Sequence, residues 1–185
     1  MLRVETTINR TVEFKVYRTS ERDPNGESSW RPLRRAVADL PRRAQVCQAS
    51  NNRYLATLQS TTGTTPLVQL VSKVCSPLTL DGQRYRALRP WSPEDSLLLQ
   101  AVADGKFALN GFRNRDLRTS LSQFQRQDIK AQTITRRLRL LRAHSIIRKV
   151  PHTHRYVVTD TGRAILTALR AAQLADVDQL TKLAA

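Results

Sequence analysis

The sequence contains few cysteine, glycine and aromatic residues, and each of these low counts argues against a class of protein. Its two cysteines, Cys47 and Cys75, are too few for a disulfide framework and lie in no C-x-x-C pair or cluster with histidine. With six glycines and none of the G-x-x-x-x-G-K-[ST], G-x-G-x-x-G and G-x-S-x-G motifs, the chain lacks the common phosphate-binding loops and the nucleophile elbow. Aromatic residues make up 5% of the 185 residues and hydrophobic residues 40%, which predicts one or two small domains with an aliphatic core.

Long apolar stretches are missing too. No run approaches the ~18 apolar residues that a membrane span needs. The first residues, Met-Leu-Arg-Val-Glu, do not resemble the apolar region of a signal peptide. The low cysteine content fits a reducing compartment. We therefore expect a soluble cytoplasmic protein with no membrane partner.

Acidic residues are scarce relative to basic ones. The chain has 31 Lys and Arg against 15 Asp and Glu, a formal net charge of +16. Such an excess predicts a polyanionic partner, and nucleic acid is the first candidate. Twenty-five of the cations are arginine, whose planar fork suits phosphate and the guanine edge better than lysine does. An anionic membrane would need an amphipathic helix with bulky apolar anchors, and every apolar face found here is better explained as core.

The first half of the chain has mixed signals. Residues 2–17 alternate between apolar and polar, which predicts a β-hairpin. Apolar positions at spacings of three and four predict helix over 30–58, with a new start near Pro41 and a nearby cap at Asp39. A short helix is expected at 65–75, followed by a connector at 76–92.

The second half has clearer boundaries. We expect first a helix from the Ser92-Pro93 cap to about 104, then a short strand at Phe107 and Leu109 and a helix capped by Asn114. A helix at 131–144 follows, and after it a hairpin in which 146–150 pairs with 155–158. The last element is a helix capped by Thr159-Asp160. The side chains expected to face the core are Leu117, Leu121 and Phe124 on one helix and Ile134, Leu138 and Leu141 on the next. The predicted class is α+β, mainly helical.

This order of elements and the amino-acid sequence of residues 131–162 resemble those of a winged helix-turn-helix domain. Thr133-Ile134-Thr135-Arg136-Arg137-Leu138-Arg139-Leu140-Leu141-Arg142-Ala143-His144-Ser145-Ile146-Ile147 is similar to the third helix and wing entry of MarR-like and ArsR-like bacterial regulators. Pro151-x-Thr153-His154-Arg155-Tyr156-x-Val158-Thr159-x-x-Gly162-Arg163 resembles the wing and its exit. The resemblance implies a winged-helix DNA-binding domain at 92–171, preceded by a hairpin and helices at 1–91 and followed by a helical extension at 172–185.

A second resemblance covers Leu2–Asn9 and Gly111–Arg118, which look like the carboxy-terminal portion of a longer family of uncharacterised bacterial proteins. It implies that this chain begins inside that family's pattern. That family supplies no function to carry over.

The helix at 131–144 is expected to show its polar face to a DNA major groove. Ile134, Leu138 and Leu141 share one side, and Leu140 falls on the opposite side. In helix-turn-helix proteins the first turns of this helix approach base edges. The residues predicted to read bases are Gln132, Thr133, Arg136, Arg137 and Arg139.

Charge is concentrated in the same region. Twelve cations and two anions lie between Arg113 and Arg155. Six phosphate contacts would make log K fall with log salt at a slope of about −5. The residues expected to contact phosphate or to act from the wing are Arg115, Lys130, Arg148, Lys149, His152, His154 and Arg155.

Catalytic interpretations of the same residues are weaker. His152 and His154 have a spacing that suits a metal, as in HUH nucleases, with Tyr156 as nucleophile; but they follow Pro151 in a turn and have no evident third ligand. Glu5 and Glu13 occupy polar positions of the expected hairpin, where solvated surface is the simpler explanation. We expect no enzyme activity, no metal and no cofactor.

Three functions remain open at this point. Sequence-specific binding of double-stranded DNA, as a nucleoid-associated bacterial transcription regulator, is the first; the step to regulation rests on fold-level analogy. A DNA-docking fragment of a replication or mobile-element protein is the second, and an RNA-binding module is the third. The apolar residues from Leu166 to Leu183 suit either a homodimer helix or packing onto the first half.

Overall fold

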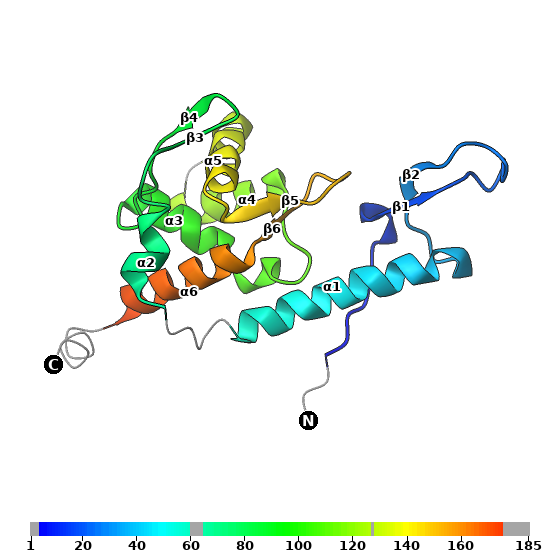
Figure 1. Cartoon of the computed structure of the whole chain (residues 1–185), viewed down its shortest axis with the longest axis horizontal. Coiled ribbons are helices and arrows are strands. Elements are labelled where there is room, and N and C mark those ends of the chain that lie inside the picture. The colour runs from blue at the N-terminus through cyan, green and yellow to red at the C-terminus, as the bar shows by residue number, and fades with distance from the viewer. Residues whose placement is uncertain (1–3, 60–64, 127, 176–185) are drawn as a thin grey trace.

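The computed structural model describes residues 4–59, 65–126 and 128–175. The chain is an α+β protein, about 51% helical, which confirms the predicted class. Over the described residues its strands form three two-stranded antiparallel sheets, β1–β2, β3–β4 and β5–β6. Figure 1 shows most helices gathered at one side and the β1–β2 hairpin at the other, with α1 running past both.

The prediction of a hairpin within residues 2–17 is wrong. Residues 4–10 form no strand, and a single 3-10 turn, η1 (Thr11–Glu13), follows them. Strand β1 (Lys15–Arg18) pairs instead with β2 (Ser29–Pro32) across the intervening loop, with Tyr17 opposite Trp30. Alternation fixes which side chains share a face of a strand but leaves the partner strand undetermined.

Helix α1 (Leu40–Gln59) follows the 3-10 turn η2 (Val37–Asp39). It begins one residue before Pro41, so the missing N–H falls in the first turn, where it has no partner to lose. The Asp39 side chain is buried and accepts a hydrogen bond from the Arg34 backbone N–H at 2.8 Å. Most other α1 side chains stay partly exposed, but Val46 and Ser50 are buried.

The connector after α2 (Leu67–Ser72) contains an element that the sequence analysis missed. Strands β3 (Leu78–Leu80) and β4 (Gln83–Tyr85) form an antiparallel hairpin. Asp81 and Gly82 turn it with positive φ values of 51° and 73°. Asp-Gly is a strong hairpin signal, because both central residues of such a turn need φ above zero.

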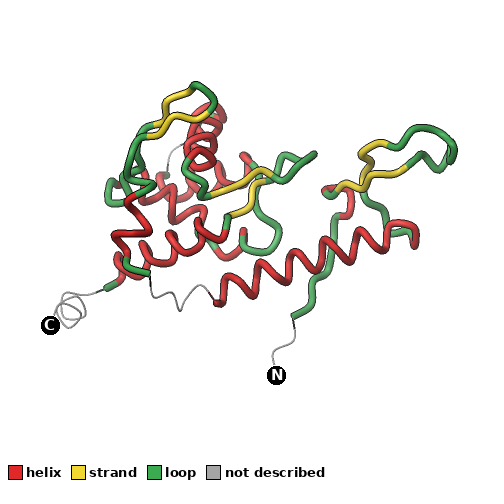
Figure 2. Tube along the Cα trace, viewed as in Figure 1, coloured by secondary structure: helices red, strands yellow, loops and turns green. Residues whose placement is uncertain are grey.

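Helix α3 (Pro93–Val102) is capped as predicted, since the Ser92 hydroxyl accepts from the Asp95 N–H. The expected strand at Phe107 and Leu109 is wrong, because Phe107 ends the 3-10 turn η4 (Gly105–Phe107). Helix α4 (Asn114–Gln125) has Arg113, not Asn114, at its N-cap. Figure 2 shows these helices packed together, with the hairpins at the periphery.

Helix α5 (Ala131–Ala143), the strands β5 (Ile147–Lys149) and β6 (Tyr156–Val158), and helix α6 (Asp160–Leu174) lie close to the predicted bounds. The Thr159 hydroxyl caps α6 by accepting from the Gly162 N–H at 2.8 Å. An isolated bridge joins Phe112 to Tyr156 and adds a third chain segment beside the β5–β6 hairpin. The part of the expected homodimer helix at 176–185 lies outside the described residues.

The buried hydrophobic cluster joins α3, α4, α5 and α6, and it includes Val74 and Leu88. It therefore continues across the expected boundary between residues 91 and 92. The predicted core positions Leu117, Leu121, Ile134, Leu138 and Leu141 are buried, but the predictions for two other residues are wrong. Phe124 is 52% exposed, and Leu140 is 7% exposed because it belongs to this cluster. Within the described residues, no helix is long and apolar enough to cross a membrane.

Candidate nucleic-acid interface

Helix α5 carries the centre of the candidate interface. Ile134, Leu138 and Leu141 are at most 2% exposed and hold the helix on the core. Its neighbour α4 is joined to it by a hydrogen bond from Asn114 Nδ2 to Thr135 Oγ1 at 3.1 Å. The predicted base-reading residues Gln132, Arg136 and Arg139 are exposed, and Thr133 is half-buried.

Arg137 has a different environment from the other predicted base-reading residues. Its side chain is 12% exposed, and its Nη2 lies 2.7 Å from Glu94 Oε1 on α3. Its Nη1 is buried with no hydrogen-bond partner in the protein. The Arg137 guanidinium therefore links α5 to α3 along the edge of the exposed face.

The cations expected to contact phosphate lie at both ends of α5. Lys130 is its exposed N-cap residue, and Arg115 stands 64% exposed in the first turn of α4. Arg148 and Lys149 are exposed on β5. The last two line a hollow with Arg142 and others, and Asp81 is the single carboxylate among its lining residues.

The loop joining β5 to β6 meets the β1–β2 hairpin. His152, with a positive φ of 59°, stacks on the Trp30 ring at 4.2 Å between centroids and 19° between planes. His154 is exposed on the same loop. Among the described residues, no group of three or more His, Cys, Asp or Glu side chains is placed to hold a metal ion.

Arg155, the last predicted wing contact, is engaged inside the protein. Its guanidinium forms an ion pair with Glu13, donates to the Asn110 carbonyl at 2.9 Å and lies 5.6 Å from the centre of the Phe14 ring. Its side chain is 12% exposed, and burial lowers the pKa of the guanidinium below its ordinary value. Arg113 Nη2 also lies 3.8 Å from the Glu13 carboxylate, so two cations share this anion.

The structure adds cations that the sequence analysis did not assign to the interface. Arg84 and Arg86 on and after β4 line a groove with Arg136 and Arg139. On α1, Arg53 donates from Nε to the Leu109 carbonyl at 2.8 Å. Burial lowers the pKa of the Arg53 guanidinium, and the charges of Arg148 and Arg163 lower it further.

The Asp81-Gly82 turn was the signal in the sequence that could have predicted the β3–β4 hairpin, which carries Arg84.

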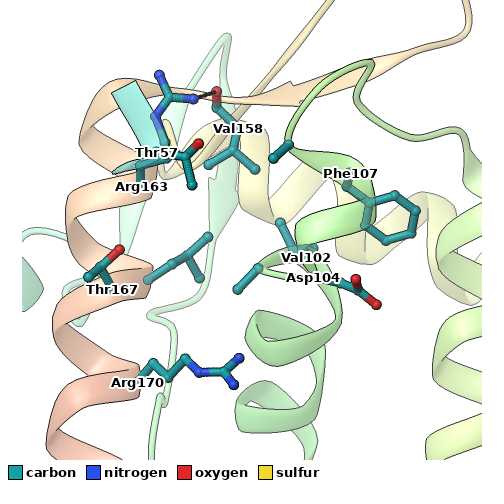
Figure 3. A pocket seen from close by; sticks show the side chains of 11 residues that line it. Thr57, Val102, Asp104, Phe107, Val158, Arg163, Thr167 and Arg170 are labelled. Atoms are coloured by element: carbon teal, nitrogen blue, oxygen red, sulfur yellow. Dashed lines mark hydrogen bonds between the residues drawn. The ribbon is translucent and has the colours of Figure 1, made fainter. Parts of the chain in front are cut away.

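A pocket of about 240 Å³ lies away from this interface. Figure 3 shows it between the end of α3 and α6, with Val102 and Phe107 on one side and Arg163 and Arg170 on the other. The Arg163 guanidinium is engaged within the protein, since it donates a hydrogen bond to the Val158 carbonyl at 3.3 Å and forms an ion pair with Asp160. None of the lining residues belongs to α4, α5 or β5.

Comparisons of the chain with protein-family models, with curated proteins and with solved structures gave no match. Function is therefore inferred from the exposed cations and from the elements that carry them.

Proposed function

We propose that this protein binds double-stranded DNA in a sequence-specific manner, through a winged helix-turn-helix unit formed by residues 92–171, and that it acts as a transcription regulator in the bacterial cytoplasm. The observation that carries the proposal is the exposed face of α5. It presents Gln132, Arg136 and Arg139 outward while its opposite face is fixed in the core. A rigid helix that presents polar and cationic side chains is the element that a major groove admits.

The order of elements supports this assignment. Helices α3, α4 and α5 precede the β5–β6 hairpin, and α6 follows it. Phe112, between α3 and α4, pairs with Tyr156 of β6, which gives the hairpin a third segment. In a winged helix-turn-helix protein the last of the three helices reads the DNA and the hairpin contacts the backbone beside it.

Base reading is assigned to the first two turns of α5. Gln132 and Arg136 are exposed in these turns and Thr133 is half-buried, whereas Leu140 in the third turn is buried. Gln suits the N6 and N7 atoms of adenine, and Arg suits O6 and N7 of guanine. Each well-formed pair contributes ~1 to 3 kcal/mol of discrimination against the wrong base.

Phosphate binding is assigned to exposed cations around α5. Arg115, Lys130, Arg148 and Lys149 stand at the start of α4, the start of α5 and on β5. These contacts would position the helix without reading sequence and would make affinity fall with salt. A second copy joined through the C-terminal helix would give a site with two half-sites.

The test begins with selection of bound fragments from a random pool of duplex DNA. Arg136→Ala and Lys149→Ala are then measured on the selected site and on random duplex. We expect Arg136→Ala to weaken binding to the selected site about tenfold with little effect on random duplex, because it removes a base contact. Lys149→Ala is the matched control and should weaken both alike, about fivefold at moderate salt.

Equal losses from the two substitutions would contradict the assignment of base and phosphate contacts. RNA duplex of equal length is included as a competitor, because preference for the RNA would contradict DNA binding. Metal-dependent nicking of the bound strand would favour a replication or mobile-element role over regulation.

A further inference from the structure

The β3–β4 hairpin is held against α5 and α3. The carbonyl of Arg86, just after β4, lies 2.8 Å from Nε2 of His144 at the end of α5. The guanidinium of Arg86 bonds both oxygens of Asp95 on α3, each at 2.7 Å. Tyr85 packs against the hydrophobic cluster that contains Leu140. These contacts fix the position of the hairpin at the side of α5 (Figure 1).

This placement creates a groove between β4 and α5 that is lined by arginine. We call it the Arg84 groove, and its charged lining residues are Arg84, Arg86, Arg136, Arg137, Arg139 and Glu94. Glu94, its single carboxylate, already pairs with Arg137. Arg86 pairs with Asp95 in the same way. Arg84, Arg136 and Arg139 are exposed on this groove and are the cations that a bound anion would meet.

A second hollow shares Gln83, Tyr85 and Arg139 with this groove. Its charged lining residues are Arg139, Arg142, Arg148, Lys149 and Asp81. Cationic surface therefore continues from β4, across Arg139, to β5. Residues of both hairpins therefore bring positive charge to the surface beside α5.

We infer that the β3–β4 hairpin is a second backbone-binding arm, and that Arg84 on it binds a phosphate of the duplex whose bases α5 reads. This inference rests on the proposed function. The duplex backbone would be held beside the Arg84 groove as well as near Lys149 on β5. A phosphate contact needs charge at a fixed position and no particular base, which an exposed arginine on an anchored strand provides.

The test compares Arg84→Ala with three matched variants on the selected duplex and on random duplex. We expect Arg84→Ala to weaken both about fivefold at moderate salt and to reduce the slope of log K against log salt by about one. Arg84→Lys keeps the charge and should retain most of the affinity. Thr79→Ala, opposite Arg84 on β3, and Lys73→Ala, an exposed cation on another element, should bind like the unmodified protein.

Unchanged affinity and salt slope in Arg84→Ala, with Arg136→Ala still weakening the selected site, would overturn this inference and leave the proposed function in place. A loss of the same size in Lys73→Ala would also overturn it, because net charge rather than position would then explain the effect. Absence of duplex binding by the unmodified protein would instead overturn the proposed function and this inference together.

Discussion

Asp95 is the residue through which several segments near the candidate interface are joined. It is 2% exposed, receives two bonds from the Arg86 guanidinium and accepts a third from the Arg89 N–H at 2.8 Å. Burial alone would raise the pKa of this carboxyl, but the bonds from Arg86 and Arg89 outweigh burial and lower it below the ordinary value. The ionised carboxylate therefore ties the segment after β4 to α3.

Asp95→Asn should lower the free energy of unfolding at pH 7 by about 1 to 3 kcal/mol, because the amide loses charge-assisted bonds. A carboxyl with a lowered folded pKa stabilises the fold above its unfolded pKa of about 3.9 and loses that contribution as pH falls through the folded value. Urea unfolding of both proteins should therefore differ at pH 7, and the difference should shrink as pH falls below about 4. Asp128→Asn, at an exposed aspartate, is the control and should differ little at either pH. A gap for Asp95→Asn that persists at low pH would contradict the charge-based explanation.

At the scale of elements, the segment between η4 and α4 depends on a glycine. Gly111 has a φ of 66°, and a Cβ placed on it would lie 2.1 Å from the Tyr156 carbonyl oxygen. Phe112 exchanges backbone hydrogen bonds with Tyr156 at 2.9 and 2.8 Å immediately after this glycine. A side chain at residue 111 would push these segments apart.

Three glycine-to-alanine variants separate backbone strain from collision. Gly111→Ala should cost more than about 2 kcal/mol of unfolding free energy, since strain and steric overlap act together. Gly82 has a φ of 73°, but a Cβ added to it would have open space around it. Gly82→Ala should therefore cost about 1 kcal/mol of unfolding free energy. Gly105→Ala has neither feature and should stay within about 0.5 kcal/mol of the unmodified protein in thermal unfolding. The reverse order of stability would contradict the role given to the Phe112–Tyr156 bridge.

At the scale of the whole molecule, the first and second halves meet at the β5–β6 loop. Glu13 pairs with Arg155, and Trp30 stacks on His152. Ser50 of α1 adds a hydrogen bond to the Leu109 carbonyl at 3.3 Å. The N-terminal elements therefore support the same hairpin whose strand β5 ends at Lys149, next to this loop.

Arg155→Ala should act on stability more than on DNA affinity, although the sequence analysis assigned this residue to the phosphate contacts. Its removal takes the nearer of two cations from Glu13 and the donor from the Asn110 carbonyl, which should cost about 1 to 3 kcal/mol in urea unfolding. Glu13→Gln, which removes the other partner, should reproduce part of that loss. If Arg155→Ala instead keeps full stability and weakens duplex binding as Lys149→Ala does, Arg155 is a phosphate contact after all.

The sequence determined the elements whose signals are local. The caps at Ser92 and Thr159, the apolar spacing of Ile134, Leu138 and Leu141 and the hairpin near 146–158 are confirmed, because each depends on residues only a few positions apart. The Asp81-Gly82 hairpin was equally local, and its signal was overlooked. Net charge and arginine content were also fixed by the sequence, and they led to the hypothesis of a nucleic-acid partner.

The tertiary structure decided which chain segments meet, since pairing and burial depend on residues far apart along the chain. It paired β1 with β2, buried Leu140 beside a hairpin more than fifty residues earlier in the chain, and engaged Arg137 and Arg155 with Glu94 and Glu13. A helical wheel gives the direction of a side chain but not what lies beside it. For that reason the arginines exposed around α5 could be identified only once the chain was folded.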